Sequence, residues 1–295
     1  MNLAPSPASH TAPAAGGQPG LHQRARGLVC RVMQASPLLS RVGFGLLVAS
    51  AFSATLILLD ARSFNGVSTW LKPWKFQFSL ALQLLTLALY MQALAPAAQR
   101  SRAVRLWSWV TAVTALFEAG YITIMGALGQ ASHFNVSTAF TAALYSLMGV
   151  GAVLLSLSGG MIGVLIARHP REGLAPALRW GLALALLLGW LLGSATGGYM
   201  SAQPGHWVGG TLSDAGGLWL FGWSRDGGDL RVAHFFGLHA MQGVALVAWW
   251  CSRSARNTGA HRQALIVTLA AATGWTTLAA FTFWQAVHGL PLLPH

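Results

Sequence analysis

The chain has 295 residues, of which 54% are hydrophobic and only 8% are charged, and its formal net charge is +12. A soluble domain averages about 25% charged residues, so this composition excludes an ordinary soluble domain and is typical of a protein embedded in a bilayer. Neither a compact basic domain nor a recognition motif accompanies the positive charge, which argues against nucleic-acid binding.

The first forty residues differ from the rest. Residues 1–20 are rich in Ala, Pro, Ser and Gly and carry no charged side chain, whereas a signal peptide starts basic and then turns apolar. Three arginines then alternate with apolar residues between positions 24 and 33, which fits either a short helix on an anionic membrane surface or a solvated linker. We expect residues 1–40 to form a disordered, basic cytoplasmic tail, and residues 41–295 to form one transmembrane domain.

Seven long apolar segments follow the tail. They cover residues 42–59, 76–95, 104–129, 138–166, 177–197, 232–252 and 263–288. Each is near or above the roughly 20 residues that a helix needs to cross about 30 Å of hydrocarbon. Only a helix satisfies its own backbone in lipid, and the segments lack the alternation of barrel strands. The sequence therefore predicts an all-α polytopic membrane protein with seven transmembrane helices and a long outer loop over residues 198–231.

The distribution of Lys and Arg predicts the orientation, because excess positive charge stays in the cytoplasm. With the N-terminus inside, thirteen of the eighteen Lys and Arg residues lie in the inner segments. We therefore expect a cytoplasmic N-terminus, a periplasmic C-terminus and a place in the inner membrane of a bacterium. Cys30 and Cys251 then lie on the cytoplasmic side, where thiols stay reduced.

Small residues recur every four positions in two of the apolar segments. They are Gly181, Ala185, Gly189, Gly193 and Gly197 in the fifth segment, and Gly159 and Gly163 in the fourth. Ridges of this type let a neighbouring helix approach closely. They predict tight packing inside the bundle or, as an alternative, a homodimer interface.

Glu118 is the only acidic residue within the seven segments. An ionisable group in the bilayer is costly unless it faces protein or water, so it is a functional candidate by default. We take Glu118 and His239 as candidate catalytic residues. The alternative for Glu118 is a protonated side chain that is hydrogen-bonded to a neighbouring helix.

Histidines gather on the predicted outer side. The five candidate ligands of a divalent metal or a haem are His133, His206, His234, His239 and His288. His234 and His239 are five residues apart and point about 140° apart on a helix, so they cannot chelate one ion as an i, i+4 pair would. A metal or haem site would therefore need ligands from several segments. For each histidine alone, an ordinary hydrogen-bonded role is the alternative.

The only two lysines of the chain also lie on this side, against the charge rule. They are candidates for binding an anionic group or for pairing with Glu118, and snorkelling to lipid phosphates is the alternative. The complete set of candidate ligand-binding residues is Lys72, Lys75, Tyr121, Arg231, Gln242 and Gln285.

Three motifs of the chain, Trp70–Phe76, Ser132–Asn135 and Asp229–Gln242, resemble a broad group of bacterial seven-helix membrane proteins. The resemblance covers most of the chain after the tail and implies a shared site, but no activity. A retinal protein is excluded because no lysine lies between residues 263 and 288. Seven-helix zinc hydrolases bind their metal through three histidines and a nearby acid, and the histidine spacing here departs from theirs.

The sequence thus predicts an integral inner-membrane protein with a periplasm-facing polar pocket for a small ligand, a metal or a haem. A metal-dependent membrane hydrolase, a transporter and an assembly factor are the alternatives. The expected partners are the lipid bilayer and a small-molecule ligand, with a homodimer through the glycine ridges as a further possibility.

Overall fold

A computed structural model describes residues 20–255 and 257–294, and the predicted disorder of residues 1–19 lies outside this range. Within it, seven helices are long and apolar enough to cross a membrane. They are α2 (Pro37–Leu59), α3 (Leu71–Tyr90, continued by the 3-10 helix η1, Met91–Ala93), α5 (Arg102–Ala127), α6 (Ala139–Arg168), α7 (Pro176–Ser201), α8 (Leu230–Ser254) and α9 (Thr258–Val287). The predicted all-α, seven-helix membrane fold is confirmed.

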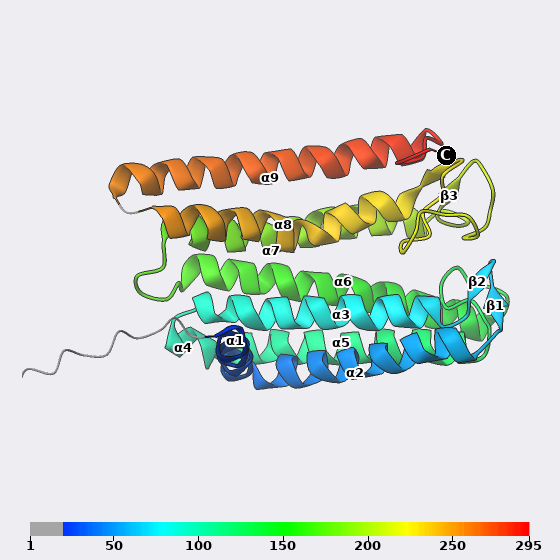
Figure 1. The fold of residues 1–295 in the computed structure, drawn as a ribbon, viewed down its shortest axis with the longest axis horizontal. Coiled ribbons are helices and arrows are strands. Elements are labelled where there is room, and N and C mark those ends of the chain that lie inside the picture. The colour runs from blue at the N-terminus through cyan, green and yellow to red at the C-terminus, as the bar shows by residue number, and fades with distance from the viewer. Residues whose placement is uncertain (1–19, 256, 295) are drawn as a thin grey trace, which may run out of the picture.

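Two short helices, α1 (Leu21–Ala35) and α4 (Pro96–Gln99), lie together at one end of the bundle (Figure 1). Helix α1 falls within the predicted tail 1–40. We call this the basic end; it also contains the connection 169–175, the end of α8 and the start of α9. The opposite end is the capped end, formed by residues 60–70, 128–138, 202–229 and 288–294.

Most transmembrane helices begin before the apolar segments that predicted them, because polar caps and prolines start a helix without adding hydrophobicity. The side chains of Ser101, Thr138, Asp229 and Asn257 each accept a hydrogen bond from a backbone N–H of the first turn that follows. Such N-caps satisfy donors that have no partner inside the helix. Helix α3 starts five residues before the predicted segment 76–95, with Pro73 in its first turn, where proline is tolerated.

Two small ribbons build the cap. Strands β1 (Ser63–Phe64) and β2 (Val67–Ser68) pair around Asn65 and Gly66, whose φ angles are 51° and 81°, and this is the signature of a tight hairpin turn. Strands β3 (Trp207–Val208) and β4 (Gly228–Asp229) pair at the base of the long loop. The loop docks on the hairpin, since the backbone N–H of Asp214 donates to the Asn65 carbonyl at 3.1 Å.

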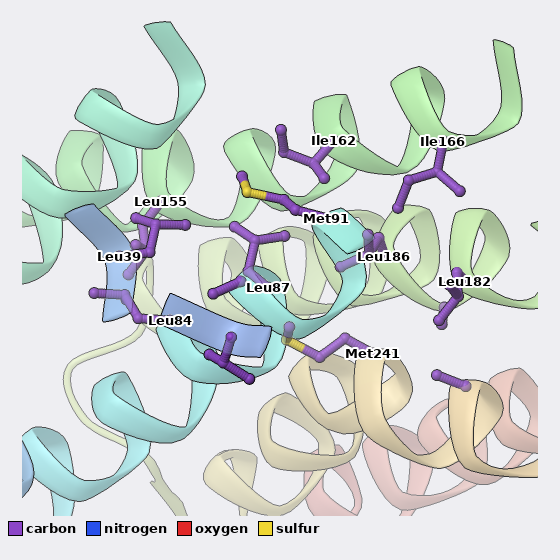
Figure 2. Close-up of a cluster of buried hydrophobic side chains, with 14 of the residues drawn as sticks. Leu39, Leu84, Leu87, Met91, Leu155, Ile162, Ile166, Leu182, Leu186 and Met241 are labelled. Carbon is purple, nitrogen blue, oxygen red and sulfur yellow. The ribbon is translucent and has the colours of Figure 1, made fainter. Parts of the chain in front are cut away.

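The main hydrophobic core joins the helices of both halves of the chain (Figure 2). Its largest fully buried side chains include Leu84 and Leu87 of α3, Met91 of η1, Ile162 of α6 and Leu186 of α7. A smaller cluster, formed by Tyr121, Ile122, Met125 and Met148, lies between α5 and α6. Most polar and aromatic contacts described below lie instead at the capped end.

The outward faces of the helices are apolar and exposed. Exposed side chains include Val48, Phe52, Leu106, Val113, Ile124, Leu191, Leu246 and Phe281. A monomeric soluble protein rarely exposes apolar surface on this scale. The chain is therefore a multi-pass membrane protein whose outer surface contacts lipid.

The glycine ridges face neighbouring helices of the same chain. An added Cβ at Gly193 would lie 2.5 Å from Leu238 Cδ2 of α8, and one at Gly163 would lie 3.0 Å from Leu186 Cβ of α7. The ridges thus let α6, α7 and α8 pack closely. A homodimer through them stays a prediction.

Candidate functional site at the capped end

An ion-pair cluster forms where the long loop meets the start of α8. The Asp229 side chain caps α8 and also binds Arg231, with 2.7 Å between Asp229 Oδ2 and Arg231 Nη2. Asp214 in the middle of the loop approaches the same guanidinium, with 2.8 Å between its Oδ1 and Arg231 Nη1. The charge of Arg231 is thus balanced by two carboxylates, and the cluster ties the cap to α8.

His206 extends this cluster toward the aromatic side chains of the loop. Its Nε2 lies 3.5 Å from Asp214 Oδ1, which is long for a hydrogen bond, and its ring lies 3.8 Å from the Trp207 ring. Burial lowers the pKa of His206, and the contact with Asp214 offsets this effect only in part. Burial alone would raise the pKa of Asp214, but the contact with His206 and the charge of Arg231 hold it below its ordinary value. His206 is therefore neutral at pH 7 beside an ionised Asp214.

The two lysines at the start of α3 have different surroundings. Lys75 Nζ donates a hydrogen bond to the carbonyl of Phe221 at 2.8 Å and so holds the cap against α3. Lys72 is exposed and makes no ion pair within residues 20–255 and 257–294. Its Nζ lies 5.9 Å from the centre of the Phe76 ring.

The charged groups around Lys72 come from other elements. Its ammonium interacts electrostatically with Arg231 of α8, Asp214 of the cap and Glu118 of α5. His133, in the connection between α5 and α6, has a pKa well below its ordinary value, because it is buried and because the charges of Lys72, His234 and His206 disfavour its protonation. Lys72 is therefore close enough to ionisable groups of α5, α8 and the cap to interact with them electrostatically, while its own side chain stays exposed.

A chain of rings connects α3, the 128–138 connection, α6 and the cap. Ring centres are 5.5 Å apart for Phe76 and His133, 6.1 Å for His133 and Tyr145, and 6.3 Å for Phe134 and His206. The backbone of Phe134 has a φ of 57°, which is unusual for a bulky residue and marks local strain. The Tyr145 hydroxyl lies 2.8 Å from Ser201 Oγ at the end of α7. The rings form an aromatic cluster at the capped end, and Phe76 is the member of this cluster that lies beside Lys72.

Glu118 lies deeper in the bundle and is 5% exposed. Its Oε1 has no hydrogen-bond partner among the described residues, and the same holds for the hydroxyl of Tyr121. Gly151 of α6 makes room for the carboxyl group, because a Cβ there would lie 2.9 Å from Glu118 Oε1. The alternative to a functional role was that Glu118 is hydrogen-bonded to a neighbouring helix. Its Oε1 does not form such a bond.

His234 and His239 face different neighbours, as their helical spacing predicts. His234 Nδ1 donates to the Gly193 carbonyl of α7 at 3.0 Å. His239 Nδ1 lies 3.1 Å from Gln242 Oε1, one turn along the same helix, and its ring lies 4.1 Å from the Phe235 ring. Both histidines already have a carbonyl oxygen as a hydrogen-bond partner. Each therefore fits the ordinary hydrogen-bonded role that was the alternative to metal or haem binding.

The remaining candidates lie at the end of α9. His288 is exposed and its Nδ1 contacts the Trp284 carbonyl at 2.8 Å, while Gln285 Nε2 contacts the Pro291 carbonyl at 3.5 Å. Among the described residues, no group of three or more His, Cys, Asp or Glu side chains could hold a metal ion. The five histidines proposed as metal ligands are thus not assembled into a metal site. The described residues contain no other cluster of this kind.

Four important residues of this site carry no predicted role in the sequence, namely Asp214, Asp229, Tyr145 and Phe76. A signal for two of them exists, because the long loop and its junction with α8 contain Asp214, Asp226 and Asp229, three of the six acidic residues in the chain. No comparable signal marks the two aromatic residues. Comparison of the chain with known protein families, with curated proteins and with solved structures finds no match.

Proposed function

We propose that this membrane protein binds a small organic or inorganic oxyanion at the capped end, with Lys72 as the group that attracts its charge. One observation carries the proposal, namely that Lys72 is exposed and has no ion pair in the described part of the chain. Its neighbours Arg231 and Lys75 are already engaged, by two carboxylates and by the Phe221 carbonyl. An ammonium without a carboxylate partner leaves its charge free to attract an anion.

Neutral polar and apolar side chains at the capped end support the binding of a small anion. His133 and His206 have lowered pKa values and are neutral at pH 7, so they offer hydrogen bonds without adding charge. The rings of Phe76 and Tyr145 both lie against the His133 ring and add apolar surface there. Binding sites for small molecules commonly combine apolar walls with a few polar groups that set orientation.

We further propose that the capped end faces the periplasm of a bacterial inner membrane. The charge distribution supports this orientation, since thirteen of the eighteen Lys and Arg residues lie toward the basic end or the N-terminus. The ligand would then enter from the periplasm. Binding and transport of this ligand both fit the arrangement, whereas a metal ion held by three or more His, Cys, Asp or Glu side chains lacks an assembled set of ligands among the described residues.

The experiment compares two lysines that lie three residues apart. Purified protein is titrated with succinate, citrate and inorganic phosphate at pH 7, with binding measured by calorimetry and by thermal stabilisation. We expect at least one probe to bind, and Lys72→Gln to weaken its affinity by about tenfold or more, because a hydrogen bond to a charged group is lost. Lys72→Arg should retain most of the affinity.

Lys75→Gln is the matched control, because it removes the same charge from a side chain that is already bonded to the Phe221 carbonyl. It should lower stability while changing affinity by less than about twofold. If no probe binds to the wild-type protein, or if Lys72→Gln binds as well as wild type, the proposal is wrong.

A further inference from the structure

A second surface feature lies at the opposite end of the bundle, between α6 and α7. It is a groove whose walls include Val164, Ala183, Leu184 and Leu187 and whose mouth carries Arg168 and Arg179. The groove has no residue in common with the capped end, so it is independent of the proposed anion site and shares with it only the proposed orientation.

Arg179 is fixed in position at the mouth of the groove. Its Nε donates to the Ala167 carbonyl at 3.0 Å, its Nη2 contacts the same oxygen, and its guanidinium lies 5.0 Å from the Trp180 ring. A guanidinium has five N–H donors, so three remain after these two bonds. The side chain therefore closes the last turn of α6 and still has donors for an anion.

The other charges nearby are positive in excess. Arg168 is exposed in the last turn of α6 and forms no ion pair among the residues described. The connection that follows contributes Arg171 and Glu172. Together with Arg168 and Arg179 of the groove, these two residues give this part of the basic end a formal charge of +2.

We propose that this groove binds one anionic phospholipid, with the phosphate at Arg168 and Arg179 and an acyl chain along Val164, Leu184 and Leu187. The walls belong to two membrane-spanning helices, and Trp180 is 42% exposed at the same level, where tryptophan favours the headgroup region. Basic pockets between transmembrane helices on the cytoplasmic side are suited to anionic headgroups. A water-soluble anion would satisfy the arginines but would leave the apolar walls uncovered.

The test measures lipid binding to the full-length purified protein by native mass spectrometry, and thermal stability in parallel. Dioleoyl-phosphatidylglycerol should bind and raise the unfolding temperature, while dioleoyl-phosphatidylcholine should do neither. Arg168→Gln should weaken binding by about fivefold, since one basic side chain near a headgroup contributes roughly that factor. The double variant Arg168→Gln/Arg179→Gln should abolish it.

Arg253→Gln is the matched control, because Arg253 also lies at the basic end, with its guanidinium 4.7 Å from the Trp249 ring, but outside the groove. It should leave lipid binding unchanged. The single variant Arg168→Gln leaves the bonds between Arg179 and Ala167 in place, so it tests the site even if the double variant folds poorly. Equal binding of the two lipids, an equal loss in Arg253→Gln, or complete competition by glycerol phosphate would each overturn the proposal.

Discussion

At the scale of single residues, the buried histidines of the capped end make stability depend on pH. Burial lowers the pKa of His133 and His206 below 6.5 in the folded protein, whereas an unfolded chain titrates near that value. Below about pH 6.5 the unfolded state therefore binds more protons than the folded state, and stability falls as the pH falls.

We expect the unfolding temperature in detergent to fall between pH 7 and pH 5, and His206→Gln to reduce this slope. The pKa of Asp214 is also lowered, so its contribution to stability is lost only below about pH 4, outside this range. If the unfolding temperature of His206→Gln depends on pH as strongly as that of the wild type, His206 is not a source of the pH dependence.

Gly151 leaves the space that the Glu118 carboxyl group occupies. Gly151→Ala would place a Cβ 2.9 Å from Glu118 Oε1, so the carboxyl group must move. Overpacking of this kind costs about 1–3 kcal/mol. Unfolding measured for Gly151→Ala, Glu118→Ala and the double variant should give a coupling energy, with the double variant less destabilised than the sum of the two single changes. Additive effects would show that the two residues do not share the space.

The sequence could predict residue types at the site but not their partners. Lys72 and Lys75 are equivalent as sequence features, since both lie in one short motif on the outer side. What separates them is the Phe221 carbonyl, 146 residues away from Lys75 in the chain. The same holds for Arg231, whose partner Asp214 comes from the middle of a loop. Tertiary contacts of this kind leave no periodic trace in a sequence.

At the scale of helices, the ridge on α7 fixes how closely α8 can pack. A Cβ at Gly181 would overlap Ala248 Cβ and lie 3.0 Å from Thr268 Cγ2 of α9. Gly181→Ala should therefore destabilise the protein by about 1–3 kcal/mol. Gly198→Ala is the control on the same helix, because nothing lies within 4 Å of its added Cβ.

The same pair of variants separates packing within one chain from dimer formation. If the ridge packs α7 against α8, Gly181→Ala lowers the unfolding temperature of the protein without changing its mass on native gels. A change in oligomeric state at unchanged stability would instead favour the dimer.

The existence of the helices was predictable, and their ends were less so. Seven apolar segments long enough to cross a bilayer leave few alternatives, because lipid forces every backbone group to bond internally. Their polar caps, such as Asp229 before α8, lie outside the apolar segments. The β1–β2 hairpin was overlooked, although Asn65-Gly66 is a strong local signal for such a turn.

At the scale of the whole molecule, the orientation can be tested with a cysteine that the chain already carries. Cys30 is exposed on α1 at the basic end. A membrane-impermeant maleimide should therefore label Cys30 in inside-out vesicles and not in intact spheroplasts. Ser213→Cys, placed in the cap of a Cys30→Ser/Cys251→Ser variant, should show the opposite pattern. Labelling of Cys30 from outside would reverse the proposed orientation.

The docking of the long loop on the β1–β2 hairpin has a consequence for biosynthesis. The Asn65 carbonyl accepts hydrogen bonds from Asp214 and Ser213, and Asp214 in turn binds Arg231 of α8. At about 5–20 residues per second, translation reaches Arg231 roughly 10–30 s after Asn65. During this time Lys72 and Lys75 have already emerged from the ribosome without the cap that later surrounds them. The early helices must therefore wait in the membrane with an unfinished polar end until α8 has been inserted.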